Sequence, residues 1–363
     1  MANNKIVYNG QTLIDLTGDT AVAEDVAQGK TFHLADGTQA TGTASGGGGD
    51  TLYEAYTQTG FSYENNNITT IPNYMLYYSK VASISSSSVT SVGNYAFNGC
   101  SALTSIDLPQ LTTIGNYSFQ QCTGLTTLNL PVITINQNAF YRCTNLTSIS
   151  LPNCTSIAGS AFRNTSVPSG VELIVNLPEC TSLGNYAFGY SPVKSVSIPK
   201  IQTLGQNVFD RCTNLTSITI PSTVSGSLYG LCYGCTNLQS VTLSDGITSI
   251  SNMGSSFYNC SSLTSITVPG TVTALQTTFY GCTSLTSVTF TGHVAQVGAQ
   301  SFYNCTNCLV YDFSHCTSVP RLMSTNAFYG INENAQIRVP AALESEWKTE
   351  ANWFSFESYI VGV

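Results

Sequence analysis

Residues 94–109 read NYAFNGCSALTSIDLP, and this phrase recurs with small changes down most of the chain. The position of Phe97, which we call the anchor, returns every 21 to 26 residues. The twelve anchors are Leu76, Phe97, Phe119, Phe140, Phe162, Phe188, Phe209, Cys232, Phe257, Phe279, Phe302 and Phe328. So short and regular a period predicts a repeat solenoid of about twelve units, because one unit is too small to bury a core alone.

Each unit contains a strand signal that ends in proline. In residues 146–152, LTSISLP, the apolar Ile149 and Leu151 alternate with Ser148 and Ser150, which is the period of a strand with one buried face. Proline cannot donate to a β-ladder and ends the strand. A second apolar pair, a Gly-Asn turn and the anchor follow. We therefore expect one strand, a return and an aromatic anchor per unit, with the strands stacked about 4.8 Å apart into a parallel sheet on one face.

These residues resemble a known repeat family. The pattern Leu-x-x-Ile-x-Leu-Pro, followed by x-Leu-Thr-x-Ile-Gly-x-x-Ala-Phe-x-x-Cys, is similar to the BspA-like class of bacterial leucine-rich repeat over residues 70–338. The resemblance implies a curved leucine-rich repeat solenoid that serves adhesion or recognition. We assign residues 51–338 to this solenoid.

The composition excludes several classes of protein. Only 8% of the 363 residues are charged, against about 25% in an ordinary soluble domain, whereas 42% are apolar. The net charge is −8 and no basic cluster exists, which argues against nucleic-acid binding. No apolar run approaches the roughly 18 residues of a membrane-spanning helix, so we expect no membrane insertion.

The 13 cysteines all fall on repeat positions of a core type. Cys232 occupies an anchor position, and Cys154, Cys180, Cys308 and Cys316 replace apolar residues. The other eight follow the anchor by three residues: Cys100, Cys122, Cys143, Cys212, Cys235, Cys260, Cys282 and Cys305. We expect reduced, buried thiols. The pairs Cys232/Cys235 and Cys305/Cys308 have the spacing of a zinc or redox site, but both follow from the repeat register. We expect no metal and no cofactor.

The first 44 residues do not fit the repeat. Two strands, at residues 5–8 and 12–16, flank an Asn9-Gly10 turn, a short helix is expected around residues 23–26, and Ala35-Asp36-Gly37 turns a second hairpin. Residues 45–50 form a glycine-rich linker. This small, mainly-β N-terminal module is similar to short modules in phage and prophage tail fibres, which implies attachment to other tail proteins. The alternative is a generic N-terminal cap.

Residues 339–363 are interpreted as a C-terminal cap. A helix is expected from Ala341 to Glu350, with Pro340 at its start. Trp347 and Trp353 lie where an exposed last repeat must be covered, and capping is favoured over ligand stacking. We recognise no signal peptide and no cell-wall anchor in the sequence. We therefore expect a virion protein in preference to a surface-anchored adhesin.

We do not expect an enzyme. His33, His293 and His315 lie in different units or domains, and no nucleophile elbow or glycine-rich phosphate loop is present. Paired carboxylates of a glycosidase type are absent from the pattern as well.

Two surfaces are candidates for binding. The first is the exposed face of the sheet, where short polar side chains form two columns: Ser105, Thr127, Ser148, Ser195, Ser217, Ser240, Ser265 and Ser287, beside Asp107, Asn129, Ser150, Ser197, Thr219, Thr242, Thr267 and Thr289. We call these the polar columns. Either they form a platform that binds a glycan or protein, or they bind nothing and are simply hydrated residues that favour β-strands.

The second surface is a tyrosine column that directly follows the anchors of the last five units: Tyr233, Tyr258, Tyr280, Tyr303 and Tyr329. Tyrosine offers an apolar ring and a hydroxyl, which suits sugar stacking and interface anchoring. The alternative is packing of the rings along the edge of the solenoid.

The sequence thus predicts a non-enzymatic recognition protein. Our first hypothesis is a phage or prophage tail-associated receptor-binding protein, located in the virion, that contacts a bacterial surface glycan or protein. The tail-fibre resemblance is compatible with a homo-oligomer. The alternatives are a secreted or cell-surface bacterial leucine-rich repeat adhesin, and a structural spacer.

Overall fold

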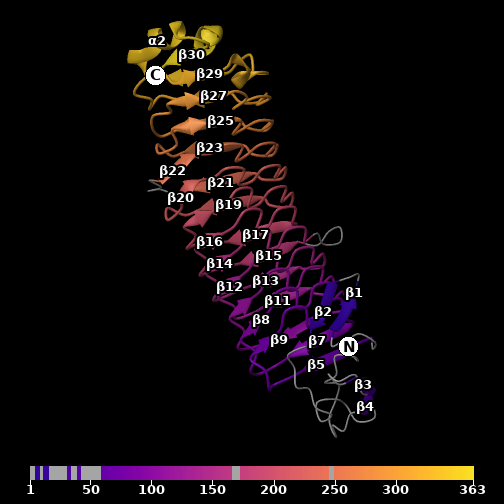
Figure 1. Cartoon of the computed structure of the whole chain (residues 1–363). Helices are drawn as coiled ribbons and strands as arrows, with labels where there is room; N and C mark the ends of the chain where they lie inside the picture. Colours follow the sequence, from indigo (N-terminus) through magenta and orange to yellow (C-terminus); the bar gives the residue numbers. More distant parts are fainter. Residues whose placement is uncertain are drawn as a thin grey trace.

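The repeats form an elongated stack of coils, in which equivalent strands of successive units lie side by side (Figure 1). This computed structural model describes residues 59–165, 172–244 and 249–363, together with four strands in the first 44 residues. Twelve units each contribute two strands, from β5 and β6 to β27 and β28. The predicted repeat solenoid is confirmed, and it is built mainly of parallel strands.

The first strand of each unit is the one that the Leu-x-x-Ile-x-Leu-Pro pattern predicts. Its apolar residues face the core and its Ser, Thr or Asn residues face outward, as in β19, where Ser217 and Thr219 are exposed and Ile218 and Ile220 are buried. The first strands are β5 (Phe61–Glu64), β7 (Val81–Ser85), β9 (Ser105–Asp107), β11 (Thr127–Asn129), β13 (Ser148–Ser150), β15 (Leu173–Asn176), β17 (Val193–Ser197), β19 (Ser217–Ile220), β21 (Ser240–Leu243), β23 (Ser265–Val268), β25 (Ser287–Phe290) and β27 (Val310–Asp312).

A second, shorter strand follows in each unit, where the sequence indicated only the return of the chain. Thr113–Ile114, for example, pairs in parallel with Ser91–Val92 on one side and Thr134–Ile135 on the other. The second strands are β6 (Thr70–Ile71), β8 (Ser91–Val92), β10 (Thr113–Ile114), β12 (Thr134–Ile135), β14 (Ser156–Ile157), β16 (Ser182–Leu183), β18 (Thr203–Leu204), β20 (Ser225–Ser227), β22 (Ser249–Asn252), β24 (Ala274–Leu275), β26 (Gln296–Val297) and β28 (Arg321–Leu322). Each coil is therefore closed by strands on two sides.

The anchor rings form stacks through the core. From Phe97 to Phe209, neighbouring ring centroids lie 5.0 to 5.7 Å apart and the rings are within 10° of parallel. A second stack runs from Phe257 to Phe328, with spacings of 5.1 to 5.8 Å. Because each ring is covered by the rings of its neighbours, the stability of one unit depends on the next.

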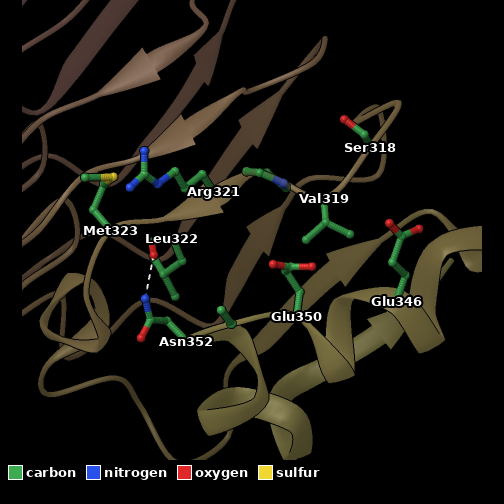
Figure 2. A pocket seen from close by; sticks show the side chains of 10 residues that line it. Ser318, Val319, Arg321, Leu322, Met323, Glu346, Glu350 and Asn352 are labelled. Atoms are coloured by element: carbon green, nitrogen blue, oxygen red, sulfur yellow. Dashed lines mark hydrogen bonds between the residues drawn. The ribbon is translucent and has the colours of Figure 1, made fainter.

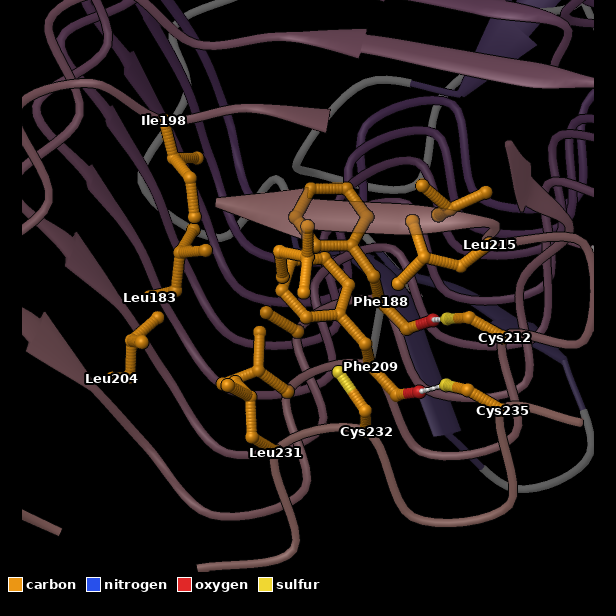
Figure 3. Close-up of a cluster of buried hydrophobic side chains, with 14 of the residues drawn as sticks. Leu183, Phe188, Ile198, Leu204, Phe209, Cys212, Leu215, Leu231, Cys232 and Cys235 are labelled. Carbon is orange, nitrogen blue, oxygen red and sulfur yellow. Dashed lines mark hydrogen bonds between the residues drawn. The ribbon is translucent and has the colours of Figure 1, made fainter. Parts of the chain in front are cut away.

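Cys232 interrupts this stack, and its neighbour compensates. Leu231 stands where other units carry a small residue such as Ala187 before the anchor, and both Leu231 and Cys232 are fully buried. Figure 3 shows Leu231 and Cys232 beside Phe209 in the core. The leucine therefore supplies the apolar volume that a cysteine at the anchor position lacks.

The eight cysteines that follow the anchors form a ladder of hydrogen bonds. Each thiol donates to the backbone carbonyl of the anchor residue in the preceding unit, at Sγ–O distances of 2.8 to 3.1 Å. Figure 3 shows two of these bonds, from Cys212 to Phe188 and from Cys235 to Phe209. Ser191 takes the same position and donates to the Phe162 carbonyl at 2.6 Å. At these nine positions the side chain therefore satisfies a buried carbonyl oxygen of the preceding coil.

All 13 cysteines are buried and none is disulfide-bonded, which confirms their assignment to the core. Burial raises the pKa of the Cys100 and Cys154 thiols to about 12 and that of Cys180 and Cys308 to about 11. The thiols are therefore protonated at neutral pH and poor nucleophiles. In the described part of the chain, no three His, Cys, Asp or Glu side chains are grouped as metal ligands.

The C-terminal residues cover the last repeat. After η2 (Thr325–Phe328), the cap comprises β29 (Gln336–Val339), η3 (Ala341–Leu343), α2 (Glu344–Thr349), η4 (Trp353–Tyr359) and β30 (Ile360–Gly362), and β30 pairs in parallel with β29. Trp347 and Trp353 are fully buried with their rings 4.6 Å apart. Trp353 packs on the last anchor, Phe328, and its indole donates to the Pro320 carbonyl at 2.7 Å. Both tryptophans thus cap the last repeat, as predicted.

Two antiparallel hairpins lie in the N-terminal region. β1 (Lys5–Tyr8) pairs with β2 (Gln11–Asp15), and β3 (Thr31–His33) pairs with β4 (Gln39–Thr41). The turns predicted at Asn9-Gly10 and Ala35-Asp36-Gly37 lie outside the described residues. The strands expected there are present. The short helix expected around residues 23–26 and the linker at residues 45–50 lie outside the described residues. Among the described helices, none has the length and apolarity needed to cross a membrane.

Candidate functional site

The polar columns are aligned by the pairing of the first strands. Ser217, Ser240, Ser265 and Ser287 are partners in successive strands. In the adjacent column, Asn129, Ser150, Asn176 and Ser197 are likewise in register. The columns are exposed or half-buried along their length. They thus provide a regular surface of hydroxyl and amide groups.

An exposed apolar side chain interrupts this face. Ile174 in β15 pairs with Ser148 and Ser195, and 55% of its surface is exposed. The repeat spacing alone does not place Ile174 in the columns, because its unit is longer than its neighbours. At the far end, Asp312 is the register partner of Arg338, so the last strands carry charge where the middle ones carry hydroxyls.

The rings of the tyrosine column stack face to face. Centroids from Tyr233 to Tyr329 are 4.5 to 4.8 Å apart, and neighbouring planes are within 13° of parallel. Partial burial, together with the neighbouring phenols, raises the pKa of Tyr258 and Tyr303. Because each ring covers the next, the inner rings offer only their hydroxyl edges. Tyr329, at 57% exposure, is the most open member of the column.

A second tyrosine stack, which the sequence analysis did not identify, lies in the first units. Tyr74, Tyr95 and Tyr117 each precede the anchor by two residues, and their centroids are 4.9 and 4.8 Å apart. The recurring Asn-Tyr dipeptide at residues 73–74, 94–95 and 116–117 carried this signal. The edge of the solenoid is therefore aromatic at both ends.

Arginine and tyrosine meet in the middle of the same edge. The guanidinium carbons of Arg163 and Arg211 lie 5.1 and 5.0 Å from the centre of the Tyr190 ring. Arg211 also donates to the Tyr190 hydroxyl and lies 5.5 Å from the ring of Tyr233. These cation–π contacts join residues from separate units into one cluster. This cluster is not predicted from the sequence.

Asp210 lies beside these arginines and is almost fully buried, with 5% of its surface exposed. Burial raises the pKa of its carboxyl group, whereas Arg211, Arg163 and the Tyr190 hydroxyl act in the opposite direction. Its Oδ1 atom accepts no hydrogen bond. The cluster therefore holds two guanidinium groups against one buried carboxyl group.

Two hollows in the described part of the surface are candidates for a binding site. The smaller, about 360 Å³, lies along the turns of the first units and is lined by Tyr78, Gly99, Ser101, Gln121, Thr123, Arg142 and Thr144. We call it the groove. It combines an aromatic ring, a guanidinium group and hydroxyl and amide groups, which are the side chains that bind sugars and acidic groups.

The larger hollow, about 510 Å³, lies between β28 and the cap. Figure 2 shows Val319, Leu322 and Met323 at its lining, with Glu346 and Glu350 on the side of the cap. The Asn352 amide donates to the Leu322 carbonyl at 2.7 Å and ties the cap to the last unit. We interpret this hollow as the junction between the solenoid and its cap.

Comparison with known proteins identifies a family and a solved structure with the same repeat architecture. The family model of the BspA type leucine rich repeat region matches six times, at residues 69–177 and 181–309. A leucine-rich repeat protein from Bacteroides ovatus is similar in structure, with a TM-score of 0.59 and 27% identity, over 83% of each chain. No curated protein matches the sequence.

Two further solved structures are similar over most of their length. The pneumococcal vaccine antigen PcpA has a TM-score of 0.46 and 14% identity, over 84% of this chain and 77% of that one. A leucine rich cell surface protein from Faecalibacterium prausnitzii has a TM-score of 0.30 and 19% identity, over 72% of this chain and 93% of that one.

Proposed function

Because this chain belongs to the BspA-type leucine-rich repeat family, we propose that it is a non-enzymatic recognition protein that acts as an adhesin at a bacterial cell surface. The observation that carries the proposal is the long exposed surface that the repeats build. The polar columns are in register within each of the three successive sheets that the first strands form, and an edge of tyrosine and arginine runs along the turns.

This surface suits recognition for a physical reason. The stacked core fixes the backbone of every unit, so the exposed side chains are held in place before a ligand arrives and little conformational entropy is lost on binding. Hydroxyl and amide groups provide hydrogen bonds, and tyrosine and arginine are the residues most often enriched at binding hot spots. The likeness to the Bacteroides ovatus protein supports a bacterial setting.

A second location, the tail of a phage or prophage, was our first hypothesis from the sequence. Its basis is the resemblance of residues 1–44 to tail-fibre modules. The two hairpins predicted there from the turn residues are present, but hairpins are not specific to tail proteins. The family match lies wholly within the solenoid, and none of the relatives named above is a phage protein. The adhesin is therefore the better supported of the two.

We expect antibodies against the solenoid to label intact, unpermeabilised cells of the bacterium that produces this chain. Treatment of the cells with an external protease should remove the label, and a cytoplasmic marker should stay intact as the control. If the chain is found in purified virions and not on cells, the tail-protein hypothesis replaces the adhesin. If it is found only in the soluble cell extract, both are wrong.

A further inference from the structure

One repeat position distinguishes the first seven units from the last five. The second residue after each anchor has a left-handed backbone. In the last five units, it is always glycine or asparagine: Gly234, Asn259, Gly281, Asn304 and Gly330. In the first seven units, large side chains predominate: Tyr78, Gly99, Gln121, Arg142, Asn164, Tyr190 and Arg211. We call these seven residues the turn-edge strip.

The large residues of this strip are held against their backbone preference. Tyr78, Gln121, Arg142, Tyr190 and Arg211 have φ angles between 52° and 61°, in the region that glycine and asparagine occupy at the lowest steric cost. Other units of this chain make the same turn with glycine. Strained residues with long polar side chains cluster at binding sites, where side-chain chemistry outweighs the backbone cost.

The groove lies on this strip and has the form of a saccharide subsite. The Tyr78 ring, 50% exposed, stands over Gly99, where an added Cβ would lie 2.7 Å from the ring. The Tyr78 hydroxyl donates to the Gln121 side chain at 3.4 Å. Arg142, three units further on, completes the lining. At about 4.8 Å per unit, the distance from Tyr78 to Arg142 is roughly 14 Å, which accommodates a short oligosaccharide.

Arg142 is prepared to bind an acidic group. Its guanidinium carbon lies 5.3 Å from the centre of the Tyr141 ring, which leaves the N–H donors at its rim for another partner. It forms no ion pair among the residues that the structure describes. The planar fork of donors matches a carboxylate or a sulfate group in a bidentate way.

Further along the strip, the positive charge continues. Arg211 and the adjacent Arg163 flank Tyr190, and the buried Asp210 offsets only one of their two charges. Three of the five arginines of the chain thus lie along this one edge, although the net charge of the protein is −8. An edge that is cationic on an acidic protein selects for an anionic ligand.

We propose that the turn-edge strip binds an anionic polysaccharide, whose sugar rings lie along the strip and whose carboxylate or sulfate groups pair with Arg142 and Arg211. The inference rests on the proposed recognition function and names its ligand class. The hydroxyl and amide groups of Ser101, Thr123 and Gln121 beside an exposed ring favour a sugar over an acidic peptide, because they match hydroxyl groups along the whole groove.

The test is titration of the full chain with polygalacturonate, heparin, neutral dextran and polyglutamate, by calorimetry at low and at physiological salt. We expect polygalacturonate or heparin to bind, dextran and polyglutamate to bind at least tenfold more weakly, and the affinity to fall as salt is added. The comparison of polygalacturonate with heparin distinguishes carboxylate from sulfate recognition. Tight binding of polyglutamate alone would overturn the proposal in favour of an acidic peptide.

Three variants locate the site. Arg142→Gly should reduce the affinity at least tenfold while the melting temperature stays equal or rises, since glycine relieves the left-handed backbone. Arg142→Gln should have the same effect on affinity. Arg321→Gln removes an equal charge outside the strip and should leave binding unchanged.

Equal affinity of the wild type and Arg142→Gln would show that the strip is not the site. If no anionic polysaccharide binds while the chain still adsorbs to cells, this inference fails and the recognition function stands.

Discussion

We expect that none of the 13 cysteines of the folded protein reacts with a thiol reagent at pH 8, and that all 13 react once the chain is unfolded in denaturant without reductant. Burial raises the pKa of these thiols above the ordinary value, to about 12 for Cys100 and to about 11 for Cys180, so the thiolate nucleophile is absent. Reaction of several thiols in the folded state would contradict the burial. Fewer than 13 thiols in denaturant would reveal disulfides.

The same pKa shifts predict that the fold is lost at alkaline pH. An unfolded cysteine releases its proton above pH about 8.5, whereas a buried one keeps it until its raised folded pKa is reached. The contribution of each thiol to stability is therefore fully present below pH 8.5 and falls as pH rises, by about 1.4 kcal/mol per pH unit for each thiol. With 13 thiols acting together, we expect cooperative unfolding between about pH 9 and 10, measured by circular dichroism.

A matched variant separates the thiols from other groups that titrate at high pH. Ser191 shows that serine donates to the anchor carbonyl as cysteine does. Replacing Cys143, Cys212, Cys260 and Cys282 by serine should therefore keep the fold at pH 7 and move the alkaline midpoint upward. An unchanged midpoint in this variant would show that alkaline unfolding has another cause.

The second large effect concerns Leu231 and Cys232. Leu231→Ala should destabilise the protein by about 2–5 kcal/mol because it opens a cavity, and Cys232→Phe should cost about 1–3 kcal/mol because the ring competes with Leu231 for space. The double variant restores the small residue and ring of the other units. Its cost should therefore be at least about 2 kcal/mol below the sum of the single changes, measured by denaturant unfolding.

The reciprocal exchange in another unit provides the control. Ala187→Leu together with Phe188→Cys recreates the Leu231/Cys232 arrangement between intact rings, and it should show coupling of the same sign. Additive costs at both sites would contradict the view that the two residues share one volume.

The repeat was readable from the sequence because its signals are strong and local. A phenylalanine every 21 to 26 residues and the Ile-x-Leu-Pro alternation predict the anchors and the first strands directly. The second strands were not predicted, because two residues such as Thr113 and Ile114 are too short to show a period of two. Their pairing arises only when the coils stack.

The candidate site was predictable only where one residue type recurs. The tyrosine column repeats the same side chain five times, so its alignment followed from the register. The contact of Arg163 and Arg211 with Tyr190 joins two repeat positions from three units, and at neither position does the same residue type recur in these units. The directions of the Tyr190 and Arg211 side chains depend on their left-handed backbone conformation. A glycine in a sequence indicates this conformation, whereas a tyrosine or an arginine does not.

The central claim is that this solenoid recognises a cell surface, and equilibrium adsorption tests it most directly. The full chain, fluorescently labelled, is titrated onto a panel of bacterial and epithelial cells, with unlabelled chain as competitor. We expect saturable adsorption to at least one cell type, abolished by excess unlabelled chain. Linear adsorption to every cell type, unaffected by the competitor, would contradict recognition and leave the structural spacer as the explanation of the fold.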